Sequence, residues 1–109
     1  MSWKVKFFET ARGIYPVKEF IQDQDKPANA KIISAIELLE TDGPYLKPPY
    51  VKKLQGKLYE LRISGQVAIR ILYTICEGEY YLLHAFKKKT QKTPIKELRI
   101  ALDRMKQLT

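Results

Sequence analysis

Three consecutive segments rich in β-branched, leucine and aromatic residues constrain the fold of this chain more than any other feature. They comprise residues 57–63, 67–75 and 79–86. Ser64-Gly65 separates the first two segments and Glu77-Gly78 the last two, and such short glycine-containing connections are typical of β-hairpins. The sequence therefore predicts an antiparallel meander in the second half of the chain.

The first half predicts one strand and a hairpin of two helices. Residues 3–8 alternate apolar side chains with lysines, which indicates a strand with one solvated face. Residues 15–21 have a proline where the first helical turn tolerates it and apolar side chains on one side. A longer helix follows Pro27, because its apolar residues share one stripe, and Asp42-Gly43-Pro44 ends it.

A final helix is expected from Thr93 to Leu108, with Thr93 as the N-cap and Pro94 at the first helical position. Its apolar residues recur at spacings of three and four, as in a helix that faces a core. Residues 45–56 contain a Pro-Pro pair and no regular period, so they are predicted to form a loop that carries lysines.

Together these elements predict the order β-α-α-β-β-β-α in one domain spanning residues 1–109. This is an α+β fold with a mostly antiparallel sheet. The single cysteine excludes an internal disulfide. Neither a signal segment nor a long apolar run is visible, so a cytoplasmic protein without membrane contact is expected.

The positive charge of the chain lies entirely in its second half. The net charge is +8, but residues 1–46 hold 6 Lys and Arg against 7 Asp and Glu, whereas residues 47–109 hold 14 against 5. Clustered cations attract phosphate polymers, so nucleic acid is the leading class of ligand. An anionic membrane is less favoured, since no helix is basic on one side and bulky and apolar on the other.

Two arginines within apolar strands are the main candidates for chemistry. Arg62 has Glu60 two residues away on the same strand face, so a structural salt bridge and a functional role both remain open. Arg70 has no acidic neighbour in sequence, which favours a functional role. No His/Cys cluster, paired carboxylates or Gly-rich phosphate loop is present, so neither a metal nor another cofactor is expected.

The pairing of the last two strands can be predicted from their turn. If Glu77-Gly78 is a two-residue turn, Arg70 lies opposite Ala85 and shares a sheet face with Lys87. His84 then falls on the opposite face, where a hydrogen-bonded core or edge histidine is the favoured interpretation. A shift of one residue would reverse these faces.

A lysine run follows the last strand and leads into the final helix. Such a run is often only a solvated connection. Here it adjoins the strand arginines, lies near a helix N-terminus and includes hydroxyl donors, which suits phosphate binding. The residues concerned are Lys87, Lys88, Lys89 and Lys92, with Thr90 and Thr93.

Four segments, in this order and spacing, resemble the RelE/ParE toxin superfamily, and especially its HigB-like, phage-derived branch. They are VKKLQGKLYELRI from Val51, AIRILY from Ala68, LLHAFKKKTQKTP from Leu82 and ELRIALDRM from Glu97. The resemblance covers most of the chain. It implies a βααβββ core with a C-terminal helix, which agrees with the order predicted from periodicity.

The resemblance also implies an activity and partners. It implies a toxin of a type II toxin-antitoxin system that cuts mRNA in the ribosomal A site and is neutralised by a HigA-like antitoxin, a small acidic or helix-turn-helix protein. A ParE-like inhibitor of DNA gyrase is the main alternative, and a basic nucleic-acid-binding protein without catalysis is another. The strand arginines and the lysine run favour RNA.

Matched residue by residue, the resemblance implies catalytic roles for Arg62 and Arg70, with the basic run from Lys87 orienting RNA. One of those lysines or His84 would transfer protons. The hypothesis is a metal-independent attack of a 2′-OH on the adjacent phosphate. The chain departs from RelE in its final helix and in having no tyrosine after Tyr81. RNA-binding candidates are Lys53, Lys57, Lys88, Lys89, Thr90 and Lys92.

Overall fold

The computed structural model describes residues 2–108 and confirms the α+β fold with a mostly antiparallel sheet. A short 3-10 turn, η1, follows the second helix. The elements are β1 (Val5–Phe7), α1 (Pro16–Gln22), α2 (Lys26–Asp42), η1 (Gly43–Tyr45), β2 (Val51–Gln55), β3 (Leu58–Ile63), β4 (Ile69–Cys76), β5 (Glu79–Lys87) and α3 (Ile95–Lys106).

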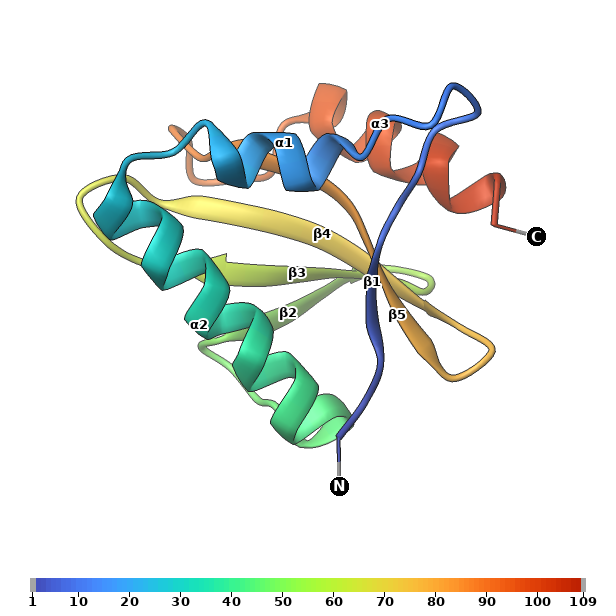
Figure 1. Cartoon of the computed structure of the whole chain (residues 1–109), viewed down its shortest axis with the longest axis horizontal. Helices are drawn as coiled ribbons and strands as arrows, with labels where there is room; N and C mark the ends of the chain where they lie inside the picture. Colours follow the sequence, from blue (N-terminus) through green and yellow to red (C-terminus); the bar gives the residue numbers. More distant parts are fainter. Residues whose placement is uncertain (1, 109) are drawn as a thin grey trace.

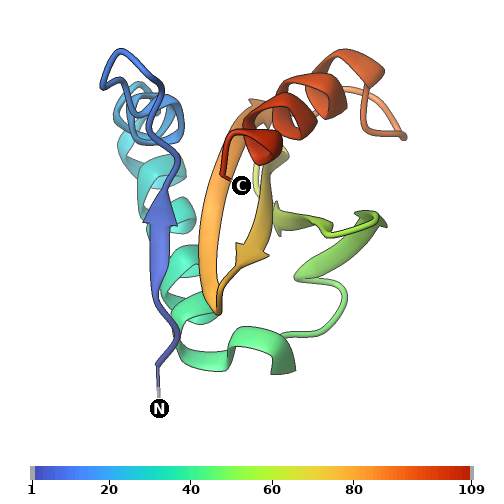
Figure 2. The same ribbon diagram turned by 90° about the vertical axis from the view of Figure 1, so that its right-hand side faces the viewer.

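The five strands form one sheet in the order β1-β5-β4-β3-β2 (Figure 1). The pairs from β2 to β5 are antiparallel, whereas β1 runs parallel to β5. Figure 2 shows α1 and α2 on one side of the sheet and α3 on the other. The sheet is therefore covered on both faces, but α3 covers only part of its face.

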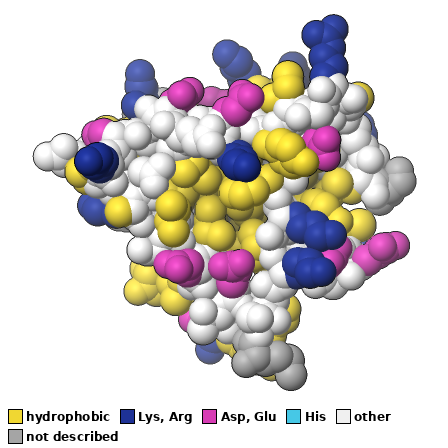
Figure 3. All heavy atoms as spheres, in the orientation of Figure 1, with side chains coloured by type: hydrophobic (Ala, Val, Ile, Leu, Met, Phe, Trp, Pro, Cys, Tyr) yellow, Lys and Arg dark blue, Asp and Glu magenta, His cyan; other side chains and the backbone are white. Residues whose placement is uncertain are grey.

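Two apolar clusters follow from this layering. The larger cluster lies under α1 and α2 and includes Val17, Ile32 and Leu39 from the helices. The smaller cluster lies under α3 and includes Leu72 and Ala101. Figure 3, seen from the side of α1 and α2, shows apolar side chains exposed near the centre of that face and Lys and Arg scattered around them.

The end of α2 agrees with the predicted Asp42-Gly43-Pro44 signal, and its start is capped by Asp25. The Asp25 side chain accepts a hydrogen bond of 2.9 Å from the Ala28 backbone N–H. Gly43 follows the helix with φ of 49°, and the Trp3 ring packs directly against its Cα. A side chain at this position would meet the indole, so glycine is required both for the backbone angle and for space.

The prediction of a loop across residues 45–56 is wrong in its second part, because Val51–Gln55 forms the edge strand β2. Val51 pairs with Leu61 and Lys52 with Glu60, but the register shifts between Lys53 and Gln55. This bulge breaks the alternation of period two by which a strand is recognised in a sequence.

The predicted register of β4 and β5 holds at the turn and fails farther along. Cys76 faces Glu79 as expected, and both turn residues have positive φ. A bulge at Leu83 then shifts the pairing, so that Arg70 lies opposite Phe86 and not Ala85. As a result His84 and Lys88 share the sheet face of Arg70, whereas Lys87 lies on the opposite face, and the predicted faces of Lys87 and His84 are wrong.

The bulge has a packing explanation. Leu82 is buried in the cluster under α1 and α2, and Leu83 is buried in the cluster under α3. The register shift leaves Leu83 without a partner on β4, and both Leu83 and His84 turn toward α3. Burial on both faces thus decides a register that turn chemistry alone cannot predict.

Candidate nucleic-acid interface

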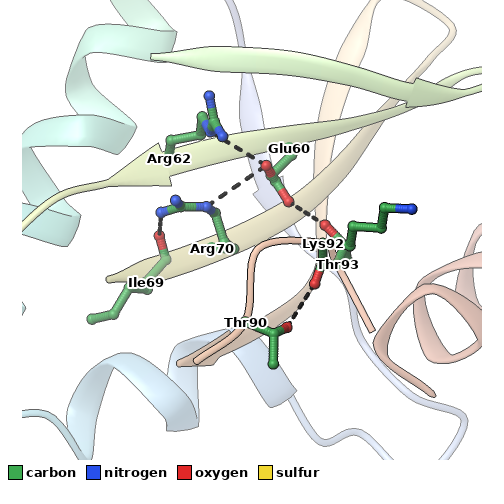
Figure 4. A network of polar contacts seen from close by, with 7 residues as sticks. All are labelled: Glu60, Arg62, Ile69, Arg70, Thr90, Lys92 and Thr93. Atoms are coloured by element: carbon green, nitrogen blue, oxygen red, sulfur yellow. Dashed lines mark hydrogen bonds and ion pairs between the residues drawn. The ribbon is translucent and has the colours of Figure 1, made fainter. Parts of the chain in front are cut away.

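A buried carboxylate lies between two arginines on the α3 face of the sheet. Arg62 on β3 is the direct partner of Arg70 on β4. Oε1 of Glu60 lies 3.4 Å from Nε of Arg62 and 3.6 Å from Nε of Arg70 (Figure 4). The Glu60 side chain is only 1% exposed. This carboxylate offsets two like charges that the strand pairing places side by side.

The other oxygen of Glu60 is engaged by the segment that follows β5. The Thr93 hydroxyl donates a hydrogen bond of 2.7 Å to Oε2 of Glu60. The prediction that Thr93 is the N-cap of α3 is therefore wrong. Pro94 occupies the N-cap position, and no side chain caps the helix. The hydrogen bond ties the lysine-rich segment to the sheet beside the arginines, as Figure 4 shows.

The two arginines differ in exposure. The Arg70 side chain is 11% exposed and donates a hydrogen bond of 3.0 Å to the Ile69 carbonyl, whereas the Arg62 side chain is 31% exposed. Burial lowers the pKa of Arg70, Glu60 opposes this shift, and Arg62 adds to it. Arg70 stays protonated at neutral pH because arginine starts from such a high pKa. The Nε atoms of both arginines are buried and form no hydrogen bond within residues 2–108.

Lys88 completes the cation cluster, which is defined here as Arg62, Arg70 and Lys88 around Glu60. It lies on the Arg70 face, and its backbone N–H donates to the Ala68 carbonyl at 2.8 Å, continuing the ladder past β5. Burial lowers the pKa of Lys88; Glu60 opposes the shift, and Arg70, Arg62 and Lys52 lower it further. The charges of Glu60 and of both arginines thus act on Lys88.

The other predicted RNA-binding residues lie around this cluster or away from it. Lys87, Lys89 and Lys92 are exposed, and the Thr90 hydroxyl donates to the Lys92 carbonyl and shapes the loop. Lys53 pairs with Tyr59 and faces the α2 side of the sheet, so the structure separates it from the cluster.

Lys57, an RNA-binding candidate, lies away from the cation cluster, whereas Lys52, which was not a candidate, lies nearer to it. Lys57 lies at the β2–β3 turn beside Thr74, at the opposite end of β3 from Arg62. Lys52 pairs with Glu60 and shares its face, so it lies nearer to the cluster. Lys52 was missed as a site residue because β2 was not recognised as a strand; the pairing of Val51 with Leu61 is the signal that places it.

Residues 19–106 match the family model described as phage derived protein Gp49-like (DUF891). This match spans most of the chain, including Glu60, Thr93 and the whole cation cluster. The chain belongs to the phage-derived Gp49-like family. That membership agrees with the general resemblance to RelE/HigB-like toxins. No curated protein sequence matches the chain.

The histidine of this Gp49-like protein is held by α3. Nε2 of His84 lies 2.7 Å from Oε1 of Glu97, and Nδ1 lies 3.4 Å from Nη1 of Arg104. The same Arg104 group donates to the Leu83 carbonyl at 2.8 Å. Burial lowers the pKa of His84, while Glu97 opposes that shift and Arg104 adds to it. These contacts make His84 an anchor of α3 on the sheet.

Within residues 2–108, no group of three or more His, Cys, Asp or Glu side chains is arranged to hold a metal ion. No helix in that range is long and apolar enough to cross a membrane.

Proposed function

We propose that this Gp49-like protein is the HigB-like toxin of a type II toxin-antitoxin system and acts as a ribosome-dependent mRNA interferase. The Gp49-like family is compatible with a toxin of toxin-antitoxin systems. The observation that carries the proposed activity is the cation cluster, in which two arginines and Lys88 surround one buried carboxylate on a partly covered sheet face. Such a preformed array suits a phosphate group of RNA.

The ion pairs orient the arginines for this task. Glu60 lies on the Nε side of both guanidinium groups. The more exposed Arg62 then presents its outer Nη donors to a ligand, while the hydrogen bond to the Ile69 carbonyl further restrains Arg70. Because these donors are positioned before RNA binds, little reorganisation is needed when charge develops on a phosphate.

The proposed reaction is metal-independent. The 2′ oxygen of a ribose attacks the adjacent phosphorus, the bond from phosphorus to the 5′ oxygen breaks, and the products are a 2′,3′-cyclic phosphate and a 5′-OH. Arg62 and Arg70 stabilise the charge on the phosphoryl oxygens. Lys88 accepts the proton of the 2′-OH, since its lowered pKa increases the neutral fraction. Another lysine of the segment or the ribosome donates a proton to the leaving 5′ oxygen.

The proposed partners follow from this activity. The substrate is mRNA in the ribosomal A site, in the cytoplasm, and the inhibitor is a HigA-like antitoxin. An antitoxin that covers the cation cluster or displaces the segment held by Thr93 would block RNA binding. The acidic character expected of such a partner complements the positive charge of residues 47–109.

Primer extension on a defined mRNA in a purified translation system tests the proposal. The wild type should produce cuts that require ribosomes, and Arg70→Ala should lower their rate by about 10²- to 10³-fold. Lys26→Ala, which removes an exposed lysine at the start of α2, should cut at the wild-type rate. Folded wild-type protein that cuts no transcript, or Arg70→Ala that cuts normally, contradicts the proposed activity. Double-strand DNA breaks in place of cut transcripts would indicate gyrase inhibition.

A further inference from the structure

A hollow of about 490 Å³ opens between α2 and the end of β3, next to the cation cluster. Its walls are largely apolar, with Ala35 and Leu38 from α2 and Leu61 and Ile63 from β3. Arg62 also lines the hollow, although its side chain pairs with Glu60 on the other face of the sheet, so this residue lies at the boundary between the hollow and the cation cluster. The hollow and the proposed phosphate site therefore meet at one residue, Arg62.

An exposed aromatic ring stands at the same rim. Tyr50 lines the hollow and is 52% exposed. Its carbonyl accepts a hydrogen bond of 2.8 Å from the Arg62 backbone N–H, which fixes the two residues side by side where β2 begins. Lys31 and the hydroxyl groups of Ser34 and Ser64 contribute polar atoms to the lining. An aromatic face, a cation and hydrogen-bonding groups therefore surround an apolar floor.

We propose that this hollow is a nucleobase subsite for single-stranded RNA, which takes the base of a nucleotide whose phosphate lies on Arg62. The inference rests on the proposed function and adds where the substrate is held. A base offers an apolar face for Tyr50 and the α2 wall, and a polar edge for Lys31 or the serine hydroxyls. The volume is that of a small-molecule pocket.

The shared arginine favours a base over an apolar side chain from a protein partner. A side chain such as leucine would fill the floor but would offer no anion to Lys31 or to the outer donors of Arg62, whose Nε side faces Glu60. A nucleotide supplies both parts, because its base and its phosphate are joined by one ribose. Stacking on an aromatic ring also tolerates any base, so the subsite adds affinity without requiring a particular codon.

The test compares two oligomers of equal charge by fluorescence anisotropy. One is a single-stranded RNA 10-mer, and the other is the same ribose-phosphate chain without bases. We expect the wild type to bind the RNA about 10-fold more tightly than the abasic chain, which is the contribution of one stacked base. Tyr50→Ala should reduce this ratio to near one, whereas Tyr50→Phe should keep it. Tyr45→Ala, an exposed tyrosine that packs on Trp3, is the matched control and should also keep it.

A second substitution alters the opposite wall of the hollow, at Ser34 on α2. Ser34→Phe fills the space from an exposed position of α2 and should lower the same ratio, while Ser34→Ala should not. This pair keeps the test valid if Tyr50→Ala fails to fold, which circular dichroism would show.

Three outcomes overturn the subsite. Equal wild-type affinity for both oligomers means that only the backbone is bound; the proposed function then stands, because ribosome-dependent cleavage is judged separately. If the wild type binds neither oligomer, the hollow is not a subsite for free RNA. If the Tyr50→Ala and Ser34→Phe variants bind RNA normally but no longer bind an antitoxin, the hollow is a site for a protein partner.

Discussion

Arg62 lies directly opposite Arg70 on neighbouring antiparallel strands, and one oxygen of Glu60 faces the Nε atoms of both. Two like charges in this relationship repel each other, and a sheet face that is partly covered weakens their hydration. The buried carboxylate of Glu60 compensates for this repulsion by pairing with both arginines. Stability and the proposed chemistry therefore depend on the same group.

Glu60→Gln keeps the size of the side chain but removes its charge. We expect the free energy of unfolding to fall by about 3 kcal/mol, because two arginines lose their buried partner. Urea denaturation at pH 7 measures the loss. Glu79→Gln is the control, since Glu79 pairs with Lys6 at 3.0 Å in a more exposed position and its loss should be smaller. Equal losses in the two variants would contradict a central role for Glu60.

Lys88 and Lys87 are neighbours in sequence, but they lie on opposite faces of the sheet. Lys88→Ala should lower the rate of mRNA cleavage by about 10²-fold through loss of the proton acceptor, and Lys87→Ala should change it little. Single-turnover cleavage on programmed ribosomes gives both rates. The reverse order of effects would support the face predicted from the turn and contradict the role of Lys88.

The cleavage rate should also depend on pH through Lys88. A base acts in its neutral form, and the lowered pKa of Lys88 moves the rise in rate to a pH below the ordinary lysine value of 10.5. The pH profile of the wild type should therefore rise toward alkaline pH, and that rise should be absent in Lys88→Ala. A wild-type rate that stays flat up to the highest pH at which the protein and the ribosome remain intact would count against this assignment.

His84 should make the attachment of α3 sensitive to mild acid. Its pKa is lowered in the folded protein, so the unfolded chain binds a proton more readily near the ordinary value of 6.5. Stability is then fully present above that pH and falls as the pH drops through the folded pKa. Urea denaturation between pH 7 and pH 5.5 should show this fall in the wild type and a flatter profile in His84→Gln. Identical profiles would mean that other groups cause it.

Two glycines with similar positive φ angles have different surroundings. Gly43 and Gly56 have φ of 49° and 53°, but only Gly43 packs against Trp3. Gly56→Ala should cost about 1 kcal/mol from the left-handed conformation alone. Gly43→Ala should cost about 1–3 kcal/mol more, because the new methyl group meets the indole. Thermal unfolding of the two variants measures the difference, which should become smaller in a Trp3→Ala background because the steric conflict with the indole is removed.

Local patterns in the sequence determined most of the elements. Apolar periodicity located the helices and four of the five strands, and Asp42-Gly43-Pro44 marked the end of α2. The turn at Glu77-Gly78 was also predicted correctly, and the ion pair between Glu60 and Arg62 was one of the two interpretations that the sequence left open, since each involves residues only a few positions apart. These features follow from interactions that a short segment contains within itself.

Only the tertiary structure decided which side chains form the candidate site. The bulge at Leu83 placed Lys88 and not Lys87 beside Arg70, and the hydrogen bond from Thr93 to Glu60 joins residues 33 positions apart. The hollow at Tyr50 likewise needs α2 against β3. Such choices depend on burying two faces of one sheet at once, and a register shift of one residue moves every later side chain to the other face. No short segment contains that information.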